Sequence, residues 1–511
     1  MRTVDFLLNG RRADPIGSAI SSGGASVATN YWTSLENSAT NAWNVNFSSG
    51  NLNNNNKYNT NQVRALAALD EKYLTSWVEA FEDCCTHKLS SEQCTEYRLR
   101  VHDLMLVAVD VATRTYYPTT SIRFYVTKPR LREVFAAAFR DRIAQHWVCI
   151  RLIPIIEERF LEVGDMSYNC RKEYGTLAAV KAYAEKIEKV SHSYTRDAWI
   201  LKLDIKSFFM TIDRKVLWSK LKPFILERYR GDDIDTLLWL TWTILRHEPQ
   251  TDCVLRGPDL LPFLERSKSL IYSDPFIGSP IGNITSQILA NFLLTFMDEA
   301  VLEYMATHGG DGLRFMDDGL YVFETKEAAL GLRDFLLEWM PANLHQQIHP
   351  KKIYLQEAHH GAKALGYVIK PGRIYIANET RGRMVDSIRS IERLCKLIVA
   401  SDEPTVRQLL ALEHFVAGLN SHFGFLTHAA ARNVILQAFS GLEYFWKVCY
   451  IVNLHTVRIR KKYQLKTLLI KKENDYIYNP PGEGHLLPEP LPPALPHHRD
   501  RHLRRPGRLH L

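Results

Sequence analysis

The chain has 511 residues, 46% of them hydrophobic, and a formal net charge of +8 at pH 7. At about 150 residues per domain, this length predicts three or four units with enough apolar side chains to bury sizeable cores. The positive charge fits a polyanionic partner.

The sequence shows no pattern of a membrane-spanning or secretory segment. No stretch approaches the roughly 18 consecutive apolar residues of a transmembrane helix, and the N-terminus lacks the apolar region of a signal peptide. The eight cysteines contain no CxxC pair, so reduced thiols are expected in place of zinc sites or disulfides. We therefore expect a soluble protein of the cytoplasm.

Residues 1–65 differ in composition from the rest of the chain. Asparagine occupies twelve of the thirty-two positions from 30 to 61, and charged residues are nearly absent. Such a polar segment buries too little apolar surface to offset the entropy of ordering, which predicts a disordered leader. Four aromatic residues set it apart from a plain linker: Tyr31, Trp32, Trp43 and Phe47.

Helical periodicity dominates residues 66–123, where apolar side chains recur at spacings of three and four. We expect five of them to form a core: Leu66, Leu69, Tyr73, Trp77 and Phe81. From residue 124 to 146, aromatic residues interleave with basic ones in a pattern that indicates a hairpin followed by a helix. Guanidinium groups offer paired donors to phosphate, so this surface suits a nucleic-acid backbone or a triphosphate. A solvated basic face is the alternative.

A single aspartate, Asp204, lies in the β-forming and otherwise apolar stretch 199–209. A buried carboxylate is unfavourable unless it is paired or binds a cation, so Asp204 needs a partner. In residues 313–323, Asp-Gly between β-forming runs predicts a hairpin turn that presents Asp317 and Asp318 at its tip. Three clustered carboxylates repel one another, and the usual resolution is a pair of divalent cations about 4 Å apart. The implied chemistry is nucleotidyl transfer.

Between these two strands, residues 278–294 indicate a glycine-containing loop that enters a helix, where backbone can approach a phosphate or base closely. The order LDIKSFF (203–209), GSPIGNITSQILAN (278–291) and FMDD (315–318) resembles motifs A, B and C of a reverse transcriptase palm. The resemblance extends from about residue 81 to residue 425. It implies an RNA-directed DNA polymerase with an α+β, right-hand polymerase fold: fingers, a palm with an antiparallel sheet, and a helical thumb.

The resemblance also implies a division of the chain into segments. In chain order they are a leader (1–65), an N-terminal helical region (66–123), fingers (124–198), the palm with motif A (199–215), a fingers/palm insertion (216–277), the palm with motifs B to E (278–375), the helical thumb (376–475) and a disordered basic tail rich in Pro, His and Arg (476–511). A helical thumb would recognise an RNA·DNA hybrid by its shape and 2′-hydroxyls.

The same resemblance implies roles for individual residues. The metal site would consist of Asp204, Asp317, Asp318 and the backbone carbonyl of Ile205, holding two Mg²⁺ ions for which Mn²⁺ can substitute. The incoming nucleotide would contact Lys128, Arg132, Phe208, Phe209, Pro280, Ile281, Gly282 and Gln287. Template and primer would contact Arg140, Arg171, Lys172 and Asn420. Phe209 matches the aromatic residue that excludes a ribose 2′-hydroxyl and so selects dNTPs.

Residues 349–355 resemble motif D of the family, and residues 365–372 resemble motif E. A lysine near the active site could protonate the departing pyrophosphate, because a cationic acid neutralises developing charge there. Lys351 and Lys352 are the candidates. Ordinary surface lysines are the alternative.

The B motif indicates a class within the family. The pattern I-G-x-x-x-S-Q, from Ile281 to Gln287, is typical of reverse transcriptases from diversity-generating retroelements, which copy a template RNA with errors at adenines. An aliphatic side chain at position 281 leaves fewer contacts that discriminate correct from wrong pairs. This class implies a bacterial or phage-encoded enzyme of mutagenic retrohoming, which diversifies a target protein gene. Its partners would be template RNA, a cDNA primer, dNTPs and a small basic helical accessory protein that assembles as a ring.

Two alternatives remain. One is a retron-like or defence-associated reverse transcriptase, and the other is a non-catalytic RNA-binding scaffold, against which the three intact carboxylates argue. The leader favours the diversity-generating class, because its Trp-, Ser/Thr- and Asn-rich composition resembles the variable region of the lectin-fold proteins that such elements diversify. Asparagine codons begin with two adenines. We therefore hypothesise that the DNA encoding about residues 20–63 is, or overlaps, the template repeat.

Overall fold

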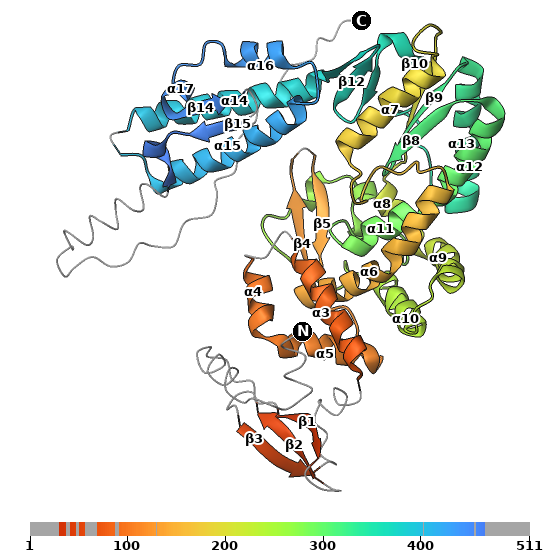
Figure 1. Cartoon of the computed structure of the whole chain (residues 1–511), viewed down its shortest axis with the longest axis vertical. Helices are drawn as coiled ribbons and strands as arrows, with labels where there is room; N and C mark the ends of the chain where they lie inside the picture. The colour runs from red at the N-terminus through yellow and green to blue at the C-terminus, as the bar shows by residue number, and fades with distance from the viewer. Residues whose placement is uncertain are drawn as a thin grey trace, which may run out of the picture. The chain divides into compact units, whose positions relative to one another are not determined.

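The computed structural model describes residues 30–36, 41–46, 51–56, 69–86, 91–128, 130–401, 403–453 and 456–465. It divides into two compact units, Met1–Ala377 and Asn378–Leu511, which are considered separately. Helices and strands are mixed in both (Figure 1), which confirms the α+β class expected from the sequence. The basic tail expected at residues 476–511 lies outside the described residues.

Three strands lie within the segment for which the sequence predicts a disordered leader. Three strands, β1 (Asn30–Glu36), β2 (Asn41–Asn46) and β3 (Asn51–Asn56), form an antiparallel sheet in that order. The register places Val45 opposite both Tyr31 and Leu52, so residues with good strand propensity share one row of the sheet. The rest of residues 1–65 lies outside the described ranges.

Two of the first helices that the structure describes pack on a long helix that follows them. Asp70 caps α3 (Glu71–Cys85) because its side chain accepts a hydrogen bond from the backbone N–H of Tyr73. Trp77 then stacks on Trp147 of α6 (Phe139–Glu162), with ring centroids 5.4 Å apart. The helices α4 (Glu92–Leu99) and α5 (Val101–Ala112) lie between them in sequence. Of the core residues expected here, Trp77 and Phe81 are buried, Leu69 and Tyr73 are partly buried, and Leu66 lies outside the described residues.

A hairpin of β4 (Ser121–Val126) and β5 (Arg132–Ala136) precedes α6, as the aromatic and basic pattern predicted. A third strand, β7 (Cys253–Leu255), pairs with β4 in parallel. Glu133 of β5 is buried and accepts hydrogen bonds from the Ser269 hydroxyl and the Leu270 backbone N–H, both at 2.9 Å. The hairpin is therefore attached to a segment far along the chain.

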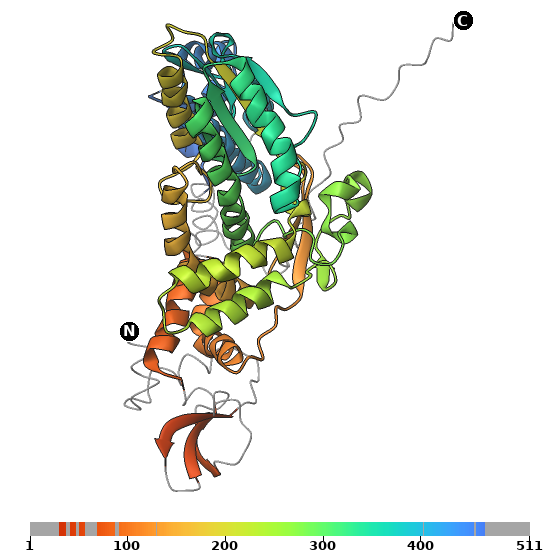
Figure 2. The same cartoon turned by 90° about the vertical axis from the view of Figure 1, so that its right-hand side faces the viewer.

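That segment belongs to the stretch between β6 and α11, which is made of helices and short turns. Its helices α9 (Arg214–Arg228) and α10 (Ile234–Leu245) lie side by side (Figure 2). After β7 come three 3₁₀ helices: η3 (Leu261–Phe263), η4 (Arg266–Lys268) and η5 (Leu270–Tyr272). The chain then enters α11 (Ile284–Leu293) and α12 (Thr295–His308), and α11 packs against both α6 and α9.

The central sheet is antiparallel, with the strand order β10-β6-β9-β8. Its strands are β6 (Trp199–Asp204), β8 (Asp311–Phe315), β9 (Asp318–Phe323) and β10 (Tyr354–Glu357). Leu320 and Tyr321 point to opposite faces of β9, and both are fully buried. The helices α7 (Thr176–Val190) and α13 (Lys326–Leu344) pack on the sheet (Figure 1). This burial makes the sheet a rigid base for side chains at its end.

A smaller antiparallel sheet follows the central sheet in the chain. After η6 (Ala358–His360), β12 (Tyr367–Lys370) pairs with both β11 (Ala362–Ala364) and β13 (Arg373–Ile376). The expected motif E, residues 365–372, contains β12 and the turn before it.

The second unit begins with a pair of long helices that pack together, α14 (Asn378–Val399) and α15 (Val406–Leu426). Two shorter helices follow, α16 (Arg432–Phe439) and α17 (Phe445–Val448). The hairpin of β14 (Cys449–Val452) and β15 (Thr456–Ile459) packs on α15, and η7 (Lys461–Tyr463) is the last element that the structure describes. Among the described helices of both units, none combines the length and apolarity needed to cross a bilayer.

Candidate active site

The three predicted aspartates come together at one end of the central sheet. Asp204 is the last residue of β6 and pairs in register with Asp318, the first residue of β9. Asp317 lies immediately before Asp318 in the turn from β8, and its backbone carbonyl accepts a hydrogen bond from Ile205 N–H at 3.3 Å. Strand pairing therefore unites residues that are more than a hundred positions apart in the chain.

The turn itself differs from the sequence expectation. Phe315 pairs with Asp318, so the two turn residues are Met316 and Asp317, whereas Asp318 and Gly319 already belong to β9. Met316 adopts a positive φ of 54°, as a tight two-residue hairpin turn requires. The Asp-Gly pair was expected at the turn because of its local propensity, but pairing of β9 with β6 extends the strand through both residues.

Two lysines neutralise two of these carboxylates. The ammonium of Lys352 lies 2.7 and 2.8 Å from the two carboxylate oxygens of Asp204, and that of Lys202 lies 3.2 Å from Asp318 Oδ1. The backbone positions Lys352, because His349 N–H donates to the carbonyl of Asp204 at 2.8 Å. Lys351, the other predicted acid, is exposed, and its backbone N–H donates to His349 Nδ1 at 3.2 Å.

The surroundings of Asp317 oppose the ionisation of its carboxyl group. Burial raises the pKa of Asp317 to about 6, with further contributions from the negative charges of Asp318 and Asp204. The positive charge of Lys352 acts in the opposite direction. A divalent cation would relieve this repulsion, and carboxylate oxygens are the ligands that Mg²⁺ prefers. The donor set therefore fits the Mg²⁺ site expected from the sequence.

The predicted nucleotide loop lies against the hairpin of β4 and β5. The carbonyl of Ile281 accepts a hydrogen bond from Phe135 N–H at 3.0 Å. Gly282 has a φ of 119°, and a Cβ there would lie 2.9 Å from Val134, so a larger residue would displace the loop. Ile281 packs against a small cluster formed by Phe135, Met210 and Leu270.

The two phenylalanines after Asp204 occupy different environments. Both belong to α8 (Phe208–Thr211), which begins after Ser207 in a left-handed conformation with φ 50°. Phe208 is buried in the main core, whereas Phe209 is half-buried and packs against the same cluster as Ile281. The carbonyl of Phe209 accepts a hydrogen bond from Ser279 N–H at 2.6 Å. The structure thus places Phe209, and not Phe208, beside the predicted nucleotide loop.

The remaining predicted nucleotide contacts lie on the surface around this loop. Lys128 and Arg132 are exposed at the end of the β4–β5 hairpin. Pro280 is half-buried in the loop, and Gln287 is exposed on α11, where Cys170 Sγ lies 3.5 Å from its side-chain oxygen. These side chains remain accessible to a ligand.

A known protein family matches the part of the chain that holds the three aspartates. Residues 155–369 match the family described as reverse transcriptase (RNA-dependent DNA polymerase). We call the matched stretch, residues 155–369, the reverse transcriptase domain. The match includes the central sheet and the predicted nucleotide loop. It does not include the second unit.

Two further comparisons concern individual proteins. The chain is 25% identical over 203 residues to protein YkfC of Escherichia coli (strain K12), which covers 39% of this chain and 46% of YkfC. The chain thus spans about half the length of this relative. Solved structures with similarity include telomerase from Candida albicans in complex with a TWJ fragment of telomeric RNA, with a TM-score of 0.39 and 9% identity over 66% of each chain. Apo telomerase from Candida tropicalis, truncated from the C-terminal domain, has a TM-score of 0.37 and 11% identity over 51% of this chain and 55% of that chain.

Within the reverse transcriptase domain, the side chain of Arg171, a predicted template contact, has partners inside the protein. Its side chain is only 1% exposed and forms ion pairs with Glu157 at 2.8 Å and Asp165 at 2.7 Å. The guanidinium also donates to the carbonyl of Ser167 and lies over the Tyr174 ring. These partners occupy the group, so Arg171 stabilises the loop before α7. Its neighbour Lys172 is exposed and remains a candidate template contact.

Two other predicted template contacts are also engaged within the protein. Arg140 forms a 2.5 Å ion pair with Asp110, donates to the carbonyl of Tyr117 and lies over the Tyr116 ring. In the second unit, the Asn420 amide donates to the carbonyl of Val457 at 3.0 Å and accepts from the Val457 N–H at 2.6 Å. Asn420 therefore attaches β15 to α15, and its role as a template contact stays a prediction.

Sequence analysis missed a buried polar network beneath the turn of the reverse transcriptase domain. Arg314 of β8 is fully buried, and its guanidinium donates to the Asp298 carboxylate at 2.6 and 2.8 Å, to Asn291 Oδ1 at 2.7 Å and to the carbonyl of Met316 at 3.0 Å. Ser167 donates to the same Asn291 oxygen at 2.8 Å. Asn291 is the last residue of the quoted B motif, and an arginine inside an apolar strand was the available signal.

Proposed function

We propose that the chain is an RNA-directed DNA polymerase whose active site consists of Asp204, Asp317 and Asp318. The observation that carries this proposal is the convergence of the three carboxylates on one end of the central sheet, within the reverse transcriptase domain. Bound divalent cations would lower the pKa of a primer 3′-hydroxyl and stabilise charge on the transferred phosphate. The three carboxylates would hold two Mg²⁺ ions, with Mn²⁺ as a substitute and the Ile205 carbonyl as a further ligand.

The chain's other residues would position the substrates. In this proposal residues 124–198 are the fingers, residues 199–215 and 278–375 the palm, residues 216–277 an insertion, and residues 376–475 the thumb. Lys128 and Arg132 would contact the triphosphate, because exposed cationic side chains bind phosphate oxygens. Pro280, Ile281, Gly282 and Gln287 would line the nucleotide position, with Phe209 against the sugar. Template RNA, a cDNA primer and dNTPs would be the partners.

Lys352 is the better candidate for the general acid. Its ammonium pairs with Asp204, and a cation that binds Asp204 would compete for the same oxygens. The displaced ammonium would remain next to the site, because the backbone of residue 349 is attached to that of Asp204. From there it could donate a proton to the departing pyrophosphate.

Within this function, we propose the diversity-generating class, with cDNA synthesis that makes errors at template adenines. The motif from Ile281 to Gln287 supports it, and so does the Asn-rich leader. A basic helical accessory protein would be the partner. A retron-like or defence-associated enzyme is the second candidate, favoured by no feature of the leader. The flanking DNA distinguishes them: a near-copy of the sequence encoding about residues 20–63, differing almost only at adenines, is expected for the diversity-generating class alone.

Primer extension on an RNA template tests the polymerase proposal. Asp317→Asn and Asp318→Asn should each lower Mg²⁺-dependent extension at least about a hundredfold, roughly 3 kcal/mol, because one ligand charge is lost. Asp334→Asn is the matched control, since Asp334 is exposed on α13 and pairs only with its neighbour Arg333 among the contacts described. Extension by Asp317→Asn at the wild-type level would overturn the assignment of Asp317 to the active site. Absence of extension by the wild-type chain would favour the non-catalytic scaffold.

A further inference from the structure

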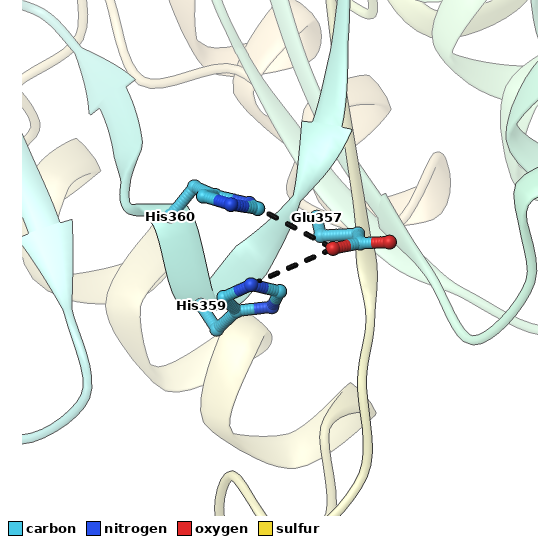
Figure 3. Close-up of side chains that lie close together, drawn as sticks. All are labelled: Glu357, His359 and His360. Atoms are coloured by element: carbon cyan, nitrogen blue, oxygen red, sulfur yellow. Dashed lines mark ion pairs between the residues drawn. The ribbon is translucent and has the colours of Figure 1, made fainter.

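Glu357, His359 and His360 lie together where β10 passes into η6 (Figure 3). Both imidazole rings face the Glu357 carboxylate: His359 Nε2 lies 3.5 Å and His360 Nδ1 lies 3.7 Å from the same oxygen, Oε2. One possible ligand atom from each residue lies within 4.8 Å of the other two. The Glu357 side chain is one-third exposed and both histidines are more than half exposed, so ions in solution can reach the cluster.

His359 is also held from its other side. Its Nδ1 lies 3.1 Å from Asp197 Oδ1, which favours the tautomer with a proton on Nδ1 and leaves Nε2 free for a metal. Histidines that bind metals usually donate their second ring N–H to a carboxylate or carbonyl in this way. The arrangement therefore has both the ligands and the outer hydrogen bond of a metal site.

The backbone keeps these ligands in place. Ala358 N–H donates to the carbonyl of Ala198 at 2.7 Å, and Gly361 N–H donates to the carbonyl of Ala358 at 2.9 Å. Gly361 has a φ of 100°, and a Cβ there would lie 3.0 Å from Val368. The turn that presents the two imidazoles is thus attached both to the segment before β6 and to β12.

The donor set selects a class of cation. Two imidazole nitrogens and one carboxylate oxygen suit borderline ions such as Zn²⁺, whereas Mg²⁺ prefers oxygen ligands. In a tetrahedral Zn²⁺ site with bonds of about 2.0–2.1 Å, the ligand atoms lie roughly 3.3 Å apart. The histidine–carboxylate separations of 3.5 and 3.7 Å exceed this value by a few tenths of an ångström. Three protein ligands would leave a fourth position for water.

The cluster is separate from the three aspartates. Strands β10 and β6 are antiparallel, and Glu357 pairs with Trp199, the first residue of β6. Asp204 is the last residue of that strand, about 16 Å away at the rise of an extended chain. An ion at the cluster would therefore not be one of the two ions of phosphoryl transfer.

We propose that Glu357, His359 and His360 form a Zn²⁺ site, with Asp197 as the positioning residue for His359. The bound ion joins the end of β10 to η6 and, through His359 and Asp197, to the segment that leads into β6. It stabilises the end of the central sheet that is remote from the three aspartates. This inference does not depend on the polymerase proposal.

The test uses the full chain purified without a polyhistidine tag, stripped of metal and returned to excess MgCl₂, which occupies carboxylate-only sites. Zn²⁺ binding is measured by competition with a chromophoric chelator, and Co²⁺ is added separately to record its visible absorption. Wild type should bind one Zn²⁺ that Mg²⁺ does not displace and should give the Co²⁺ spectrum of a site with nitrogen ligands. The paired change His359→Ala/His360→Ala should abolish both signals.

Two further variants keep the test decisive. Glu357→Gln preserves the shape of the side chain and should weaken Zn²⁺ binding at least tenfold. Asp197→Asn should weaken it roughly tenfold, since partners of ligating histidines typically contribute 10- to 100-fold. Melting curves recorded without metal should match wild type for each variant, because all four side chains are partly or largely exposed.

The control is the other adjacent histidine pair of the sequence, His497 and His498. His497→Ala/His498→Ala should retain the wild-type affinity and spectrum. Wild-type Zn²⁺ affinity in His359→Ala/His360→Ala would overturn the proposal, and so would loss of the bound ion only in His497→Ala/His498→Ala. Absence of Zn²⁺ binding by wild type would overturn it as well.

Discussion

The guanidinium of Arg314 lies 2.6 Å from the carboxylate of Asp298, and neither side chain is exposed to solvent. Arg314 also donates to the carbonyl of Met316, the first residue of the turn that carries Asp317. Removing two charges from water opposes folding, so a buried ion pair contributes little net stability by itself. Because Arg314 contacts the turn, we infer that the ion pair positions the turn of the predicted active site.

We expect single changes in this pair to be strongly destabilising. Asp298→Leu or Arg314→Met leaves one buried charge without its partner, and such losses amount to about 3–5 kcal/mol of unfolding free energy. Urea unfolding of the whole chain measures the effect. Arg333→Ala is the control, because the exposed pair with Asp334 contributes about 0–1 kcal/mol.

The double variant Asp298→Leu/Arg314→Met separates stability from positioning. Replacing both charges with apolar groups should recover most of the stability, while the hydrogen bond to the Met316 carbonyl stays absent. We therefore expect a folded protein with reduced primer extension. Full extension by the double variant would show that the pair has no positioning role.

The raised pKa of Asp317 predicts that the metal-free protein is less stable at neutral pH than in mild acid. The folded state binds this proton more tightly than the unfolded state, so stability should rise as pH falls through about 6. In EDTA at about pH 7.5, Asp317→Asn should be more stable than wild type by about 1–2 kcal/mol, a value that allows for solvent screening of a half-buried group. The difference should shrink as pH falls towards 4, where wild-type Asp317 is protonated. Thermal unfolding across this range measures it.

Asp204→Asn provides the comparison for this pH series. Its carboxylate is paired with the Lys352 ammonium, so removing the charge should give no such gain at neutral pH. If both variants gained the same stability, the cause would be the total charge of the cluster and not the environment of Asp317.

Phe209 and Phe208 should respond differently to truncation. Phe209→Ala should admit ribonucleotides, because the half-buried ring beside the loop is removed. Phe208→Ala should instead lower stability by about 3–5 kcal/mol, the usual cost of emptying a buried aromatic site. Incorporation of rNTPs and unfolding by urea, measured on both variants, test the pair. Wild-type discrimination in Phe209→Ala would leave Phe209 with a packing role only.

Ile281 should influence the fidelity of cDNA synthesis. Ile281→Gln introduces a polar group at the loop and should lower the error rate, chiefly opposite template adenine, because it adds contacts that differ between correct and wrong pairs. Ile281→Val keeps the aliphatic character and is expected to preserve the error spectrum. Sequencing of cDNA copied from one RNA template compares both with wild type. An unchanged spectrum in Ile281→Gln would exclude Ile281 as a cause of the errors.

The sequence predicted the local elements of the active site well, because strand propensity and apolar alternation are properties of neighbouring residues. It identified the two strands that carry Asp204 and Asp318, and the loop that contains Ile281. It placed the hairpin turn too late, because the Asp-Gly signal is local and pairing with β6 is not. Its prediction of disorder for residues 1–65 rests on composition, and β1, β2 and β3 lie within that segment.

The sequence by itself determined which carboxylates are available and which strands present them. The tertiary structure decided which polar side chains remain free, because a hydrogen bond or ion pair with a residue far along the chain removes a group from ligand binding. Arg171 and Asn420 carry the side chains of nucleic-acid contacts, yet partners within the protein occupy both. Likewise, the sequence does not distinguish Lys352 from its neighbour Lys351, because the two side chains are chemically equal. In the folded chain they point in different directions, and Lys352 reaches Asp204.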